Sequence, residues 1–197
     1  MSVRHSMSPR LWLLLLLPGT AGAHVSVQTV ELLAGGLHPW INLDSALVLA
    51  GLALWLSQSA TSTELRPYLV MGVAVAAGMG GGLLSGATPP PALVSGIALL
   101  VGLAVALRLQ PALFARMFTT GCLAAVAGYY AGIDAAPDVR SPLAFSAGAL
   151  AGGMVVSLSA GILLGERQSR VIRTGVRIIG SWLAAVALML CALRLRR

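Results

Sequence analysis

The fold is decided by the stretch Gly35-Gly36-Leu37-His38-Pro39-Trp40-Ile41-Asn42-Leu43-Asp44-Ser45, which precedes an unbroken apolar run. That run, residues 46–56, is typical of a membrane-spanning helix. Asp44 therefore lies about one turn or more inside a predicted span. A carboxylate at the centre of such a helix costs about 2.5–3.5 kcal/mol on insertion scales, so it needs a partner or a function. The alternative is a shallow, solvated residue that favours the positive end of the helix dipole and binds nothing.

The composition is that of an integral membrane protein. Of the 197 residues, 57% are hydrophobic and 10% are charged, whereas about a quarter are charged in soluble domains. The net charge of +7 comes from thirteen basic residues, all of them arginine. These arginines flank apolar segments, so lipid headgroups and membrane topology explain them better than a nucleic-acid partner does. Cys122 and Cys191 lie far apart in apolar segments and form no metal or redox motif.

Residues 1–23 have the pattern of a cleaved secretory signal peptide. Arg4 and Arg10 precede a leucine-rich core, and Ala21-Gly22-Ala23 supplies a small-residue cleavage site. The core is too short to span a bilayer, which takes about 20 residues. We therefore expect the mature chain to begin at His24. Its amine and imidazole together suit a transition metal, although any residue can follow a cleavage site.

Six apolar segments follow, and we expect residues 24–197 to form an all-α bundle of six transmembrane helices. The predicted spans are residues 40–56, 67–84, 92–109, 113–133, 143–165 and 171–193. Short connections make sequential helices antiparallel neighbours. Glycines spaced four apart predict close helix packing, within the chain or between copies of it, at Gly78, Gly82 and Gly86, at Gly148 and Gly152, and at Gly161 and Gly165.

The arginines predict the orientation in a bacterial inner membrane. With the mature N-terminus outside, the positive-inside rule is obeyed by Arg66, Arg108, Arg116, Arg167, Arg170, Arg173 and Arg177. Asp134 and Asp138 then lie outside, in a loop with a single arginine, Arg140. The exceptions are the last arginines, Arg194, Arg196 and Arg197, which would also lie outside.

The sequence holds no catalytic motif, so we do not expect an enzyme. On a helix that starts near Pro39, His38, Asn42 and Ser45 share one face. Asp44 is displaced from that face by about a third of a turn. One ion would touch both His38 and Asp44 only if His38 lies in an irregular stretch before the helix. His38 as a helix cap or interfacial residue stays an open alternative. The scattered methionines are expected to fill space in the core or face lipid.

The chain resembles the HupE/UreJ family over nearly its whole length. The resemblance is carried by a signal peptide that ends in Ala-His, by Gly-x-x-His-Pro-x-x-x-x-Asp at the first span, by a glycine-rich second helix, and by an arginine-rich start of the last helix. Members of that family are regarded as nickel or cobalt permeases linked to hydrogenase and urease maturation. The resemblance therefore implies secondary transport of a divalent transition metal.

Several histidines of the family are absent. Its first motif resembles His-Pro-x-x-Gly-x-Asp-His, but Asn42 stands here at the glycine and Ser45 at the second histidine. The resemblance places a His-rich segment of the fourth helix at residues 127–131 and a further histidine near residues 156–159, where this chain has none. Imidazole suits nickel, so these losses weaken the site that the resemblance implies.

Two functions remain in view. One is a permease for nickel or cobalt with a weak site at His38 and Asp44, helped by His24 and supported by Asn42 and Ser45. Its affinity would fall below about pH 6.5, where imidazole takes up a proton. The other is a non-transporting accessory or assembly protein of the same fold. In either case the partners expected are the lipid bilayer and, for the permease, a divalent metal ion, with no resident cofactor.

Overall fold

The computed structural model describes residues 27–58, 64–85, 87–135, 140–165 and 169–196. The predicted signal peptide, His24 and Asp138 lie outside this part of the chain. Within it, every regular element is a helix, as predicted. The helices are α2 (Val27–Ile41), α3 (Leu43–Ser57), α4 (Arg66–Ser85), α5 (Pro91–Ala106), α6 (Leu113–Ala135), α7 (Pro142–Gly165) and α8 (Arg170–Leu195).

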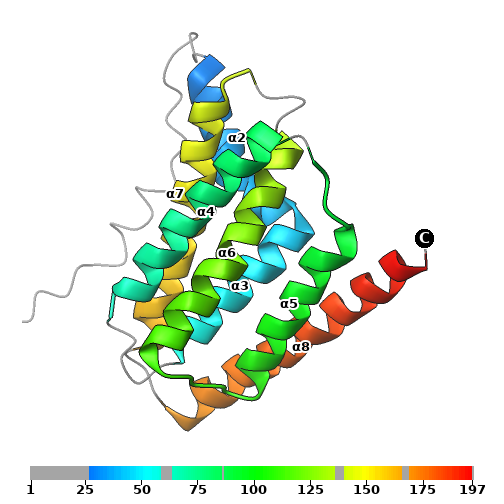
Figure 1. Cartoon of the computed structure of the whole chain (residues 1–197). Coiled ribbons are helices and arrows are strands. Elements are labelled where there is room, and N and C mark those ends of the chain that lie inside the picture. The colour runs from blue at the N-terminus through cyan, green and yellow to red at the C-terminus, as the bar shows by residue number, and fades with distance from the viewer. Residues whose placement is uncertain (1–26, 59–63, 86, 136–139, 166–168, 197) are drawn as a thin grey trace, which may run out of the picture.

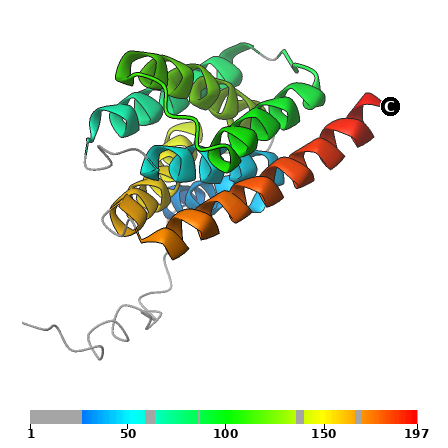
Figure 2. The same cartoon turned by 90° about the horizontal axis from the view of Figure 1, so that it is seen from below.

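Three closely packed helix pairs surround α3. The pairs are α4 with α6, α5 with α8, and α2 with α7, and α3 contacts α5, α6 and α7 among others. Figure 1 shows α4 and α6 in front of α3, and Figure 2 shows α8 on the opposite side of the bundle from them. The side chains of Val48, Leu52 and Leu56 are at most 1% exposed. The uniformly apolar run that follows Ser45 is therefore the buried centre of the bundle.

The bounds of the predicted apolar segments coincide with helices α4 to α8 to within a few residues, but the first segment, residues 40–56, differs from the structure at its start. We expected a helix that begins near Pro39 and leaves His38 outside it. Instead α2 continues through both residues to Ile41, and α3 begins at Leu43. The chain changes direction at Asn42, where the axes of the two helices meet at 77°.

Three helices, α4, α7 and α8, are long and apolar enough to cross a membrane, and the bent pair of α2 and α3 together makes a fourth. Helix α5 is apolar but has only 16 residues. The structure is thus that of a membrane helical protein. Six spans remain a prediction, because length and hydropathy select fewer helices than the sequence pattern does.

Glycines bring the backbones of α4 and α6 into contact. A Cβ atom built on Gly78 would overlap the carbonyl oxygen of Ala125, and one on Gly82 would overlap that of Tyr129. In return, a Cβ on Gly128 would overlap the carbonyl oxygen of Val75. The predicted packing face at Gly78 and Gly82 is confirmed, and its partner is a helix of the same chain.

The same arrangement joins α2 to α7. A Cβ on Gly148 would overlap the carbonyl oxygen of Leu32, and one on Gly152 would overlap that of Gly36. The second predicted face is therefore also confirmed and also filled within the chain. These two faces are closed to other helices unless the bundle opens.

Substituting Gly128 tests this packing, with Gly80 as the matched control on the partner helix. Gly128→Ala should lower the free energy of unfolding by about 1–3 kcal/mol, because the methyl group forces α4 and α6 apart. Gly80 has no atom within 4 Å of a built Cβ, so Gly80→Ala should stabilise the protein by about 0.5–1 kcal/mol. Unfolding in mild detergent, followed by circular dichroism, measures both. Equal effects of the two variants would refute the close approach.

Candidate functional site

Asn42 forms the junction between α2 and α3. Its backbone N–H donates to His38 O at 3.0 Å, which closes the last turn of α2. Its side-chain Oδ1 accepts from the N–H groups of Asp44 at 3.1 Å and Ser45 at 3.2 Å, which caps α3. Pro39 lacks the N–H that would continue the hydrogen-bond ladder of α2, so the helix is already weakened one turn earlier. The bend thus follows from a proline followed by an N-cap residue.

Asp44 does have a partner within the membrane domain, and that partner is Arg194. The two guanidinium nitrogens donate to the two carboxylate oxygens at 2.9 and 2.6 Å. Nη1 of Arg194 also donates to Ser95 Oγ at 2.6 Å and to Pro91 O at 2.9 Å. The exposed fractions of the side chains are 19% for Asp44 and 27% for Arg194. This bidentate pair ties α3 to α5 and α8, and it explains one of the arginines that departed from the positive-inside pattern.

Asp44 and Asn42 line a cleft with a second carboxylate, Asp134. The cleft has a volume of about 190 Å³. Asn42 Nδ2 donates to Asp134 Oδ2 at 2.7 Å, and the Tyr130 hydroxyl donates to Pro90 O at 2.6 Å. The lining comes from the bend and from α5 and α6, and comprises Asn42, Asp44, Thr88, Pro89, Pro91, Val94, Tyr130, Ile133 and Asp134.

His38 does not line this cleft. Its ring packs edge-on against Phe145 of α7, with the ring centroids 5.1 Å apart. Its Nε2 is buried and has no hydrogen-bond partner among the described residues. Of the residues predicted for the site, the structure thus joins Asp44 with Asn42 and sets His38 apart.

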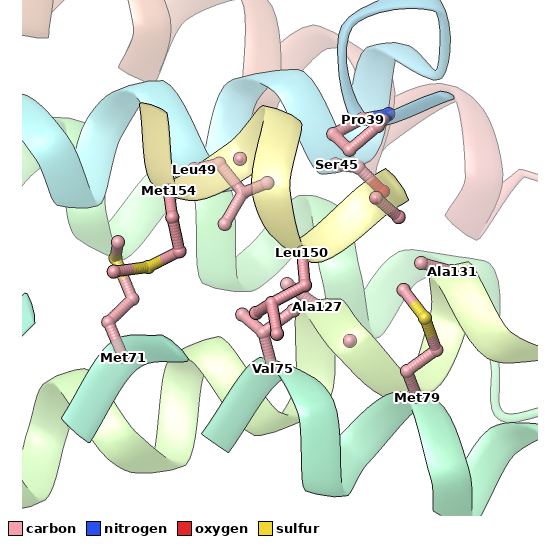
Figure 3. Close-up of a pocket in the computed structure, with 13 residues that line it drawn as sticks. Pro39, Ser45, Leu49, Met71, Val75, Met79, Ala127, Ala131, Leu150 and Met154 are labelled. Atoms are coloured by element: carbon pink, nitrogen blue, oxygen red, sulfur yellow. The ribbon is translucent and has the colours of Figure 1, made fainter. Parts of the chain in front are cut away.

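Ser45 points into a different hollow, at the centre of the bundle. This cavity is small, about 20 Å³, and its lining includes Pro39 from α2, Met71 and Met79 from α4, and Met154 from α7 (Figure 3). Met71 and Met79 are at most 2% exposed, which agrees with methionines that fill the core. The bend therefore contributes to both hollows, with Asn42 and Asp44 in the cleft and Pro39 and Ser45 in the cavity.

The cavity is also where the resemblance places the missing His-rich segment of the fourth helix, residues 127–131. Ala127, Gly128 and Ala131 line it from α6, and Gly153 does so from α7. These residues offer no metal ligand. Within the described ranges, no group of three or more His, Cys, Asp or Glu side chains is placed to hold a metal ion.

Sequence reasoning missed two members of the cleft, Asp134 and Tyr130, and the partner of Asp44. Asp134 stands 92 residues from Asn42, and Arg194 stands 150 residues from Asp44. Nothing local in the sequence links these positions. The one available signal was that Asp44 and Arg194 were each anomalous, a carboxylate inside a span and an arginine on the wrong side.

A double-mutant cycle tests the Asp44–Arg194 pair. Asp44→Asn and Arg194→Gln should each lower the free energy of unfolding by about 1–3 kcal/mol, because each leaves a partly buried charge unpaired. The double variant should lose less free energy of unfolding than the two single variants together, by about 1 kcal/mol or more. The control cycle uses Glu64 and Arg66, which are 3.9 Å apart with Arg66 72% exposed, and its coupling should be near zero. Equal coupling in the two cycles would contradict the pairing.

Comparison with known proteins gives one match. The model of the HupE / UreJ protein family matches residues 12–190, which is most of the chain. The comparisons with curated proteins and with solved structures give no significant match. The family is one of nickel and cobalt accessory transport rather than of enzymes. On the extent of this match, the chain belongs to the HupE/UreJ family.

Proposed function

We propose that this protein is an inner-membrane permease for a divalent transition metal ion, nickel or cobalt by family, and that the ion enters through the cleft. The observation that carries the proposal is the convergence of Asp44, Asp134 and Asn42 on one hollow at the bend. The two carboxylates come from different helices and give the cleft the oxygen ligands that divalent cations take, and the Asn42 side chain orients Asp134. Such a site discriminates poorly among divalent ions, so its affinity is modest.

Arg194 competes with the ion for Asp44 in this proposal. Its guanidinium neutralises Asp44 through both carboxylate oxygens. A divalent ion that binds Asp44 and Asp134 must displace the guanidinium group of Arg194. Binding of the ion is therefore coupled to release of the end of α8 from α3. Because Asn42 also caps α3, the bend that separates cleft from cavity is the element that moves when the ion passes inward, in keeping with broken helices in transporters.

His38 and His24 are secondary ligands in this proposal. His38 lies one turn before Asn42, and its Nε2 is unpartnered among the described residues, so its imidazole is available as a ligand. A turn of its ring away from Phe145 would bring it into the path of the ion. His24 remains a prediction for the outer end of the mature chain, and Ser45 a supporting residue at the cavity.

The alternative, a non-transporting accessory protein, is favoured by one specific observation. The side chains that line the cavity at the bend are apolar except for the hydroxyl of Ser45. The argument that glycine faces recruit other helices is weaker than the sequence implied, because α4 pairs with α6 and α2 with α7 through those faces.

Metal binding to the purified protein separates the two functions. Calorimetry with nickel, cobalt, zinc and copper should show weak binding. Asp44→Asn and Asp134→Asn should each lower the affinity by about tenfold, which corresponds to a loss of about 1.4 kcal/mol. Arg194→Gln should raise the affinity, because it removes the competing cation. Glu64→Gln is the control variant, because this carboxylate does not line the cleft. Binding that is absent, or equal in wild type and the Asp44→Asn, His38→Ala double variant, would favour the accessory protein.

Transport itself is measured with a metal-sensitive dye inside proteoliposomes. Wild type should accumulate the ion, and Asp44→Asn should not. If His38 is a ligand, the wild-type rate should fall as the pH is lowered and the imidazole takes up a proton, and His38→Ala should remove that part of the pH dependence.

Cysteine labelling tests the six-span topology, in which even the short α5 crosses the membrane. Thr88 and Leu109 lie just before and just after α5 and are both exposed. In a background without Cys122 and Cys191, Thr88→Cys should react with an impermeant reagent from outside and Leu109→Cys only after the membrane is opened. Reaction of both from one side would show that α5 does not span.

A further inference from the structure

The arginine-rich end of the bundle holds a pocket that transport of a metal cation does not explain. It lies where the last turns of α3, α5 and α7 meet the first turns of α8. Trp55 Nε1 donates to Leu109 O at 2.7 Å and Arg177 Nε to Ala106 O at 2.9 Å, which joins the helix ends here. The pocket is lined by Ser57, Gln58, Arg108, Leu164, Ile172, Arg173 and Val176.

Two exposed arginines stand at the rim of this pocket. Among the residues that the structure describes, neither Arg108 nor Arg173 has a carboxylate partner or donates a side-chain hydrogen bond. Glu64, the described carboxylate at this end, is 3.9 Å from Arg66. The first turn of α8, capped by Ser169, adds the positive end of a helix dipole. Among the described residues the positive charge of the rim is thus not compensated, and the rim suits an anion.

Arg108 is held at the rim by an unusual backbone. Its N–H donates to Val105 O at 3.1 Å, and the N–H of Leu109 donates to Ala104 O at 2.9 Å. These are the two hydrogen bonds of a Schellman motif, in which Arg108 takes the left-handed position with φ of 54°. Glycine is the usual residue there, because any Cβ is strained in that conformation. The chain keeps a strained arginine at the one position where glycine would end α5 with less strain.

The floor of the pocket needs a hydrogen-bond donor. Gln58 is 8% exposed, and its Nε2 donates to Val105 O at 3.0 Å. Its Oε1 is buried and has no partner among the described residues. The neighbouring Ser57 hydroxyl is already engaged, because it donates to Leu54 O at 2.7 Å. The pocket volume of about 10 Å³ admits a group of about the size of one hydroxyl.

We propose that this pocket binds an anionic phospholipid with a glycerol headgroup. The phosphate lies at the rim between the guanidinium groups of Arg108 and Arg173, and a headgroup hydroxyl enters the pocket and donates to Gln58 Oε1. Arginine matches phosphate through paired N–H donors, and basic pockets between membrane helices bind such headgroups. A zwitterionic lipid is disfavoured because its ammonium group would face two arginines. The site lies at the opposite end of the bundle from the cleft and does not depend on metal transport.

Native mass spectrometry of the full-length protein, released from nanodiscs of mixed lipid, tests the proposal. Wild type should retain phosphatidylglycerol over phosphatidylcholine by at least about fivefold, which corresponds to about 1 kcal/mol for one arginine. Arg108→Gly should lose most of that preference while unfolding at the same temperature or higher in phosphatidylcholine, because glycine suits the left-handed position. Arg173→Gln should lower the preference as well. Arg170→Gln, in the same turn of α8 but outside the pocket, should leave it unchanged.

Two further arms identify the ligand. Phosphatidylmethanol has the same charge but no headgroup hydroxyl, so wild type should retain it less than phosphatidylglycerol. Millimolar inorganic phosphate, added to protein in phosphatidylcholine, should not raise the unfolding temperature. Equal retention of the two anionic lipids, stabilisation by free phosphate, or an Arg170→Gln effect equal to that of Arg108→Gly would each overturn the proposal.

Discussion

Direct contact between helix backbones is the constraint on which this structure depends. In lipid the hydrophobic effect does not drive helices together, so close packing must do so. At Gly78, Gly128 and Gly148 a single Cβ would collide with the carbonyl group of the neighbouring helix. The pairs that these glycines create hold α3 at the centre of the bundle, and the position of α3 in turn fixes Asp44 at the cleft.

Local patterns predicted most of this fold because they depend on near neighbours in the sequence. The lengths of apolar segments located α4 to α8, and glycines four residues apart located the contact faces of α4 and α7. The bend was missed because Pro39 was taken as the start of a helix. A proline suits the first turn, and only the capping bonds of Asn42 show that it belongs to the last turns of α2.

The candidate site was predicted in part for a related reason. Asp44 and Asn42 were identified because they stand out within an apolar sequence, whereas His38 was grouped with them by its spacing on a helix that the bend interrupts. Asp134 reaches the cleft through the packing of α6, and Arg194 reaches Asp44 through the packing of α8. No spacing in the sequence encodes either contact. An ionisable residue inside a span signals that a partner exists, but the fold decides which residue it is.

The pairing of Asp44 with Arg194 also sets an order of events during synthesis. The two residues are 150 positions apart, so at about 5–20 residues per second the ribosome makes Arg194 about 8–30 s after Asp44. Throughout that interval the carboxylate of Asp44 in α3 has no counter-ion. Only the packing of α8 against α3 and α5 neutralises this charge, so a chain truncated before the last turn of α8 keeps an unpaired carboxylate at the start of α3.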